Sequence, residues 1–84
     1  MKRIEWQYHI GAFGTECLKP QFDGVDLDDP FYNKMSDKFW PLAYLSELDG
    51  TALLACFKSG QAETVSGETA TPLGNGRFVV EYDV

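Results

Sequence analysis

The sequence predicts an α+β fold, in which a small antiparallel sheet of about four strands carries one or two short helices on one face. Segments of strictly alternating apolar residues near both ends of the chain indicate strands. Between them, a segment that begins with proline and has apolar residues at helical spacing indicates a helix. The predicted order is a strand, one or two helices and three further strands, which is typical of helices packed on an antiparallel sheet.

The first predicted strand covers residues 3–10. One of its faces carries Ile4, Trp6, Tyr8 and Ile10, and the other carries Arg3, Glu5, Gln7 and His9. This alternation, with aromatic and β-branched residues, is typical of a half-buried strand. Residues 11–29 have no clear period and are predicted to form a long ordered loop, with a short extended piece around residues 21–25 as an alternative. A loop of this length is uncommon in a small domain, so it is either functional or hides an element that the pattern does not reveal.

A helix is predicted to begin at Pro30, because Asp28 or Asp29 can cap its N-terminus and proline suits the first helical position. Its apolar stripe recurs every four residues and consists of Phe31, Met35 and Phe39. Pro41 restricts the residue before it and should end or kink the helix. With the two alternating strands, this stripe supplies most of the predicted core, namely Trp6, Tyr8, Phe31, Met35, Phe39, Phe78 and Tyr82.

Residues 42–48 allow two interpretations. Leucines at every third position favour a second short helix that ends at Gly50, whereas Asp49-Gly50 as a two-residue turn would create a hairpin. Residues 51–57 are apolar at nearly every position and are predicted to be a central strand, buried on both faces. Residues 62–68 follow as a weak edge strand.

The final strand is predicted from the alternation of Phe78, Val80, Tyr82 and Val84 with polar or smaller residues. The preceding Leu73-Gly74-Asn75-Gly76 is predicted to be a turn, because glycine and asparagine tolerate positive φ. On the predicted central strand, Leu53, Ala55 and Phe57 would pack under the helices. Ala52, Leu54 and Cys56 would then form a small apolar strip on the other sheet face, covered by the chain's own loop, a second copy or another protein.

The 84 residues are predicted to form one domain, residues 1–84, with 13 Asp and Glu against 7 Lys and Arg and a net charge of -6. Binding to nucleic acid or to anionic lipid needs clustered Lys and Arg, and the longest basic run is Lys2-Arg3. The chain has neither a run of about 18 apolar residues nor an apolar stretch after Lys2-Arg3 of the kind a signal peptide needs. We therefore expect a cytoplasmic protein that contacts neither nucleic acid nor membrane.

The two cysteines, Cys17 and Cys56, have a spacing that suits neither a disulfide framework nor a metal site. We expect two reduced thiols, with Cys56 buried, and we expect no metal and no other cofactor. We assign no catalytic residue. His9 is the only histidine and belongs to no recognisable motif, and neither a helix N-terminus nor a base that could activate the Cys17 thiol is visible in the sequence.

The segment 23–29 concentrates charge, with Asp23, Asp26, Asp28 and Asp29 and no basic residue. Carboxylates can bind Ca²⁺ or Mg²⁺, but their spacing here is wrong for an EF-hand, and helix capping explains part of the cluster. With the nearby aromatic residues Tyr32 and Trp40, this segment is predicted to form an acidic surface for a basic protein partner.

These observations favour a small non-catalytic interaction module, acting alone or as a homodimer. A narrower version is an inhibitor or accessory protein of a phage or mobile element that mimics nucleic-acid charge. The alternative is a small-molecule-binding or divalent-metal-binding domain or an enzyme subunit. Its pocket would lie between the sheet and loop 11–29 and use His9, Glu81 and one of the aspartates.

Overall fold

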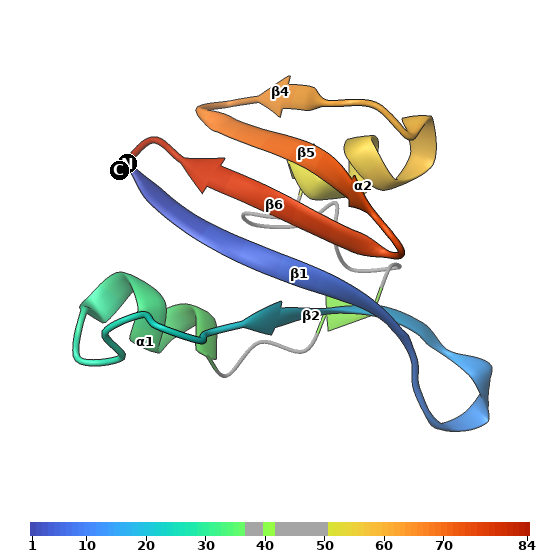
Figure 1. Ribbon diagram of the computed structural model, residues 1–84, viewed down its shortest axis with the longest axis horizontal. Helices are drawn as coiled ribbons and strands as arrows, with labels where there is room; N and C mark the ends of the chain where they lie inside the picture. The colour runs from blue at the N-terminus through green and yellow to red at the C-terminus, as the bar shows by residue number, and fades with distance from the viewer. Residues whose placement is uncertain (37–39, 42–50) are drawn as a thin grey trace.

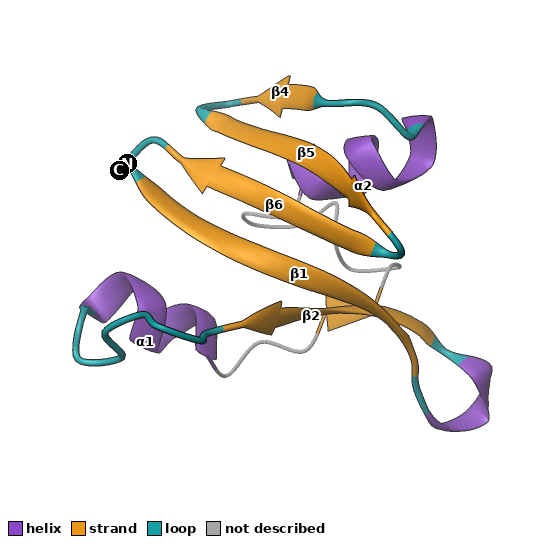
Figure 2. Ribbon diagram, viewed as in Figure 1, coloured by secondary structure: helices purple, strands orange, loops and turns teal. Residues whose placement is uncertain are grey.

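The computed structural model describes residues 1–36, 40–41 and 51–84 and confirms the α+β class. Its strands form one antiparallel sheet in the order β3-β2-β1-β6-β5-β4, with six strands rather than about four (Figures 1 and 2). In chain order, the elements are β1 (Lys2–Ile10), the short 3-10 turn η1 (Ala12–Gly14), β2 (Glu16–Gln21), α1 (Pro30–Ser36), β3 (Trp40–Pro41), α2 (Thr51–Ser59), β4 (Glu63–Val65), β5 (Glu68–Gly74) and β6 (Arg77–Tyr82).

The two strands with the clearest alternation, β1 and β6, lie side by side in the middle of the sheet. Ile4 is paired with Val80 and Trp6 with Phe78, so the apolar face of each strand continues across the other. The ladder extends to the pair Lys2–Tyr82, which brings the two ends of the chain together (Figure 1). The sheet is therefore built outward from this central pair.

The core lies on one face of the sheet, and both helices contribute to it. α2 packs against β4 and β5, and the ring of Phe31 on α1 contacts the ring of Tyr82 at a centroid distance of 5.1 Å. The buried cluster consists of Ile4, Trp6, Leu18, Met35, Ala52, Leu53, Cys56, Ala70, Phe78, Val80 and Tyr82. Of the other predicted core residues, Tyr8 and Phe31 are half-buried, and Phe39 lies outside the described residues.

The predicted central strand at residues 51–57 is wrong, because this segment forms helix α2. Its fully buried residues Ala52, Leu53 and Cys56 follow the one-sided spacing of a helix rather than the two-sided spacing of a strand. Gly60 ends the helix: it has a φ of 73°, and its N–H donates to the carbonyl of Cys56 at 2.8 Å. An all-apolar run fits a buried strand and a buried helix equally, and alanine and leucine favour the helix here.

The predicted loop 11–29 contains strand β2, which pairs with β1 from Glu5–Gln21 to Ile10–Glu16. Two features concealed this strand. Cys17 and Leu18 are adjacent and both fully buried, so polar and apolar residues do not alternate. Pro20 also argues against a central strand, and it is tolerated here because the described part of β3 pairs only with Cys17 and Leu18.

The predicted edge strand at 62–68 is divided by a turn. Only Glu63–Val65 forms edge strand β4, and Ser66-Gly67 is a two-residue hairpin loop in which both φ angles are positive, at 50° and 80°. The chain then returns as β5, so the sheet gains a strand that the pattern did not show. The predictions at residues 37–39 and 42–50, including the choice between helix and hairpin, lie outside the described residues.

The predicted turn before the final strand is confirmed. Asn75 and Gly76 have φ angles of 55° and 75° and join β5 to β6. The carbonyl of Gly76 also accepts the N–H of Tyr8 at 2.7 Å, which ties this hairpin to β1. β6 ends at Tyr82, so Val84 lies beyond it and is exposed.

Candidate functional site

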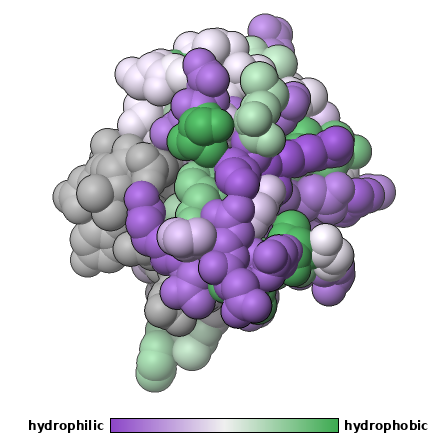
Figure 3. All heavy atoms as spheres, turned by 90° about the vertical axis from the view of Figure 1, so that its left-hand side faces the viewer, coloured by the Kyte–Doolittle hydropathy of each residue, from purple (hydrophilic) through white to green (hydrophobic). Residues whose placement is uncertain are grey.

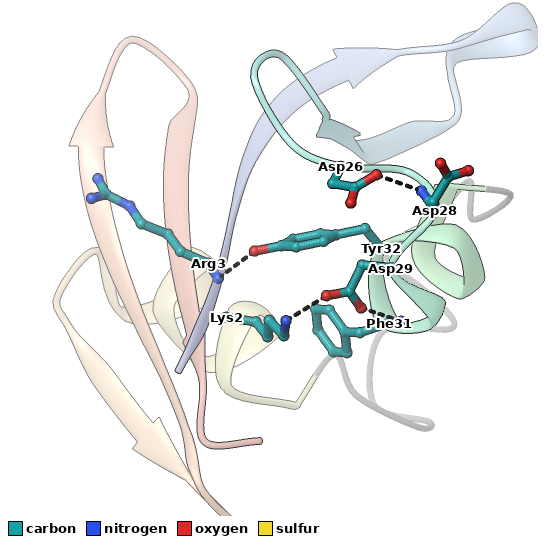
Figure 4. Close-up of polar contacts among 7 residues, drawn as sticks. All are labelled: Lys2, Arg3, Asp26, Asp28, Asp29, Phe31 and Tyr32. Carbon is teal, nitrogen blue, oxygen red and sulfur yellow. Dashed lines mark hydrogen bonds and ion pairs between the residues drawn. The ribbon is translucent and has the colours of Figure 1, made fainter.

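The acidic segment forms a turn-rich loop, residues 22–29, which joins the end of β2 to the start of α1. Two backbone hydrogen bonds shape it, from the Val25 N–H to the Phe22 carbonyl at 3.3 Å and from the Asp29 N–H to the Asp26 carbonyl at 3.1 Å. The loop and the first turn of α1 lie against the start of β1 (Figure 4). Residues that are about 25 positions apart therefore share one site.

Asp29 anchors this loop in two directions. Its carboxylate accepts the N–H of Phe31 at 2.8 Å, as expected of a helix-capping residue, and pairs with the Lys2 ammonium at 2.5 Å. The hydrogen bond from Lys2, followed by the one from the Phe31 N–H, holds the pKa of Asp29 below its usual value. The same bond raises the pKa of Lys2. Asp29 therefore has a structural role as the link between α1 and β1.

The other three aspartates are more exposed to solvent than Asp29. Asp26 accepts the N–H of Asp28 through its side chain at 2.9 Å, which is a local turn contact of the kind aspartate commonly makes. The carboxylates of Asp23 and Asp28 remain exposed. Three acidic side chains of the loop therefore face solvent while the fourth fastens the loop to the sheet.

Tyr32 on α1 bridges the helix and β1. Its hydroxyl accepts the backbone N–H of Arg3 at 3.4 Å, and the Lys2 ammonium lies 5.5 Å from the centre of its ring. The ring of Phe31 meets it edge-on at 5.4 Å. This hydroxyl contacts β1 where the ladder to β2 has already ended, since Glu5–Gln21 is the last pair on that side.

A groove of about 360 Å³ opens at this point between β1, the loop and α1. It is lined by Arg3, Glu5, Gln21, Asp23, Val25 and Tyr32. Glu5 also pairs with the Arg77 guanidinium at 3.4 Å. The guanidinium of Arg3 points away from Tyr32 in Figure 4. The charged residues of the lining are two carboxylates and this one guanidinium. We take this groove as the candidate site.

The surface at this end of the molecule is mainly hydrophilic. Figure 3 looks onto the end that carries α1 and both chain ends, and hydrophilic residues cover most of it around separate hydrophobic ones. A smaller hollow of about 180 Å³ also lies near the chain ends, lined by Phe31, Lys34, Ser66, Gly67, Glu68, Tyr82, Asp83 and Val84.

The structure brings some of the predicted partner-binding residues together. Asp23 and Tyr32 line the groove, and Asp26, Asp28 and Asp29 belong to the loop that bounds it. Trp40 is elsewhere, in β3, where it pairs with Leu18. Sequence analysis missed four lining residues, namely Arg3, Glu5, Gln21 and Val25. Arg3 and Glu5 could have been found from the polar face of the predicted strand at residues 3–10, to which both belong.

The predicted apolar strip of Ala52, Leu54 and Cys56 is wrong as a sheet face, because these residues lie on α2. Ala52 and Cys56 are fully buried in the core, and Leu54 is half-buried against it. The pocket expected for a small-molecule or metal-binding domain also has a different lining. A groove does lie between the sheet and the loop, but His9 and Glu81 do not line it.

The described residues also show the state of the two cysteines and the arrangement of groups that could bind a metal. Both cysteines are buried free thiols, as expected for Cys56, and burial raises the pKa of the Cys56 thiol. In residues 1–36, 40–41 and 51–84, no three His, Cys, Asp or Glu side chains gather as a metal site would require. Neither described helix has both the length and the apolar character that a membrane span requires.

Comparisons with known proteins provide no relative from which a role could be transferred. No protein family matches the chain, and neither a curated protein nor a solved structure matches it.

Proposed function

We propose that the protein is a small non-catalytic binding module that takes a basic segment of a partner protein in the groove between β1, the 22–29 loop and α1. The observation that carries the proposal is the convergence of Glu5, Asp23 and Tyr32 on one groove, although they come from three different elements. Two carboxylates against the one guanidinium of Arg3 leave the lining with a net negative charge, and a negative cleft attracts cations and speeds their association.

Electrostatics support a basic rather than an acidic partner. Asp26 and Asp28 extend the negative charge beyond the groove, and the Lys2 ammonium is already paired with Asp29. The whole chain carries a net charge of -6, so the long-range field favours cations as well. The volume of about 360 Å³ is at the lower end for ligand sites, which suits one or two side chains of a short segment.

The test is an NMR titration of the ¹⁵N-labelled protein with two matched peptides, acetyl-Arg-Ser-Lys-Ser-Arg-Ser-amide and its counterpart with glutamate at each basic position. We expect the basic peptide alone to shift the backbone amides of the six groove residues. Raising the salt concentration should weaken this binding, because the groove carboxylates are open to solvent. Equal binding of both peptides, or shifts confined to another surface, would overturn the proposal.

A matched pair of variants separates the groove from general charge. Asp23→Asn removes one carboxylate from the groove and should weaken binding about two- to fivefold, the range that one exposed ion pair supplies. Glu63→Gln removes the same charge from β4, at the far edge of the sheet, and should leave the affinity unchanged. Equal weakening by both variants would mean that the basic peptide responds only to net charge.

A second candidate function is the binding of a small zwitterion, such as a free amino acid. The mixed lining favours it, because Arg3 and Gln21 can donate hydrogen bonds while Glu5 and Asp23 accept them. A thermal-shift screen with amino acids separates the two functions, since a ligand of the native state raises the melting temperature. A rise that Asp23→Asn abolishes, without binding of the basic peptide, would favour this second function.

A further inference from the structure

We infer that the group recognised in the groove is an arginine guanidinium, stacked on the ring of Tyr32 between the carboxylates of Glu5 and Asp23. The inference rests on the proposed function and names the side chain that the groove prefers. Three features of the site lead to it, namely a fixed aromatic ring, the side of that ring away from Lys2, and two carboxylates that line the same groove.

The ring of Tyr32 is held in place by three contacts. Its hydroxyl is bonded to the backbone of Arg3, the ring of Phe31 packs against it, and the Lys2 ammonium lies over it. A ring that is already ordered costs little further side-chain entropy when a ligand stacks on it. Tyr32 therefore offers a preformed surface.

One face of this ring is directed into the groove. Successive side chains of a strand point to opposite faces of its sheet, so Lys2 and Arg3 leave β1 in opposite directions. Lys2 contacts the ring from the core side, whereas Arg3 and Glu5 line the groove on the other. In Figure 4 the ring lies between the side chain of Lys2 and the loop that carries Asp26. The face away from Lys2 is turned toward that loop, and Tyr32 lines the groove that the loop bounds.

The two carboxylates then distinguish the kind of cation. Glu5 reaches the groove from β1, where it also pairs with Arg77, and Asp23 reaches it from the loop, so carboxylate acceptors from two elements line the same groove as Tyr32. A guanidinium is planar and has five donors, so it can stack on a ring while its edge donates to carboxylates. A lysine ammonium is a more strongly hydrated point charge and gains less from a flat aromatic surface. The site therefore fits arginine better than lysine.

The experiment compares the tripeptide acetyl-Gly-Arg-Gly-amide with versions that carry lysine, citrulline or glutamate in the middle, titrated into the ¹⁵N-labelled protein. We expect the arginine peptide to bind about threefold or more tighter than the lysine peptide, with citrulline weaker than both. The δ-methylene protons of the bound arginine should shift upfield, because they would lie above the Tyr32 ring. Equal binding of the arginine and lysine peptides, or no upfield shift, would overturn the inference.

Variants at Tyr32 separate the ring from the hydroxyl. Tyr32→Phe keeps the ring and should keep the preference for arginine, whereas Tyr32→Leu should bind arginine and lysine peptides alike. Should Tyr32→Leu fail to fold, the upfield shift measured with the wild-type protein still decides the question. If lysine and arginine peptides bind equally but the glutamate peptide does not, the inference fails and the proposed function stands. If the glutamate peptide binds as well as the basic ones, the proposed function fails too.

Discussion

The end of β5 and the turn after it allow one energetic prediction to be worked out in detail, because they contain two glycines with similar φ angles and different surroundings. Gly74 and Gly76 have φ angles of 86° and 75°. A Cβ atom at Gly74 would meet nothing within 4 Å, whereas one at Gly76 would lie 3.1 Å from the Cβ of Tyr8 and 3.3 Å from the Nε2 of Gln7. Replacement by alanine should therefore cause similar backbone strain at both positions, but a steric clash only at Gly76.

The strain of an L-residue at positive φ costs about 1–2 kcal/mol, and the reduced freedom of the unfolded alanine chain returns about 0.4–1 kcal/mol. We therefore expect Gly74→Ala to lower the free energy of unfolding by about 0.5–1 kcal/mol. Gly76→Ala should cost about 1–3 kcal/mol more, the range typical of overpacking, because the turn and β1 must separate slightly to admit the methyl group beside Tyr8. That separation also strains the hydrogen bond between the Tyr8 N–H and the Gly76 carbonyl.

Thermal unfolding followed by circular dichroism measures the difference. For a domain of this size, about 1 kcal/mol corresponds to about 4–8 °C, so Gly76→Ala should melt at least about 4 °C below Gly74→Ala. Equal melting temperatures, or a lower value for Gly74→Ala, would show that the turn does not sit against Tyr8 as described.

Three further outcomes are expected. Leu53→Ala should lower the free energy of unfolding by about 2–5 kcal/mol in urea titrations, while exposed Lys58→Ala should change it by less than about 0.5 kcal/mol. Because the folded pKa of Asp29 is lowered, its stabilising effect is present above its unfolded value of 3.8 and is lost as the pH falls through the folded pKa. Urea titrations at several acidic pH values should therefore show a steeper loss of stability for the wild type than for Asp29→Asn. Cys17 and Cys56 should react slowly with a thiol reagent at neutral pH in the native protein and rapidly in urea, because both are buried.

Elements with one apolar and one polar face could be predicted from the sequence, and elements without that contrast could not. β1 alternates because it has a buried and a more exposed face, and β6 does so except at Val79, which is buried as well. Pro30 with Asp29 marks the start of α1 by local chemistry alone. The segment of α2 gave no such contrast, since all of residues 52–57 are apolar. The helix propensity of alanine and leucine favours the helix there, and the one-sided burial of Ala52, Leu53 and Cys56 agrees with it.

The candidate site could be predicted only in part, for a different reason. Asp23 and Tyr32 lie close together in the sequence, and the concentration of aspartates drew attention to them. Arg3 and Glu5 reach the groove because β2 pairs with β1 and then turns away after Gln21. That geometry depends on β2, which the sequence pattern did not reveal because Pro20 and the buried Cys17 interrupt the alternation expected of a strand. The local charge pattern of the loop indicated one side of the groove. The other side, formed by β1, follows from how the strands pair and could not be read from a local pattern.

The central position of the β1–β6 pair also has a consequence for how the chain folds. Lys2 and Tyr82 are neighbours in the ladder although nearly the whole sequence separates them. A growing chain on the ribosome can form the β1–β2 hairpin early, but the inner edge of β1 has no partner until residues 77–82 have been synthesised. Closure of so long a loop makes folding slow for a protein of this size. A truncated chain that lacks β6 would leave that edge and the apolar face of β1 exposed, so it should aggregate rather than fold.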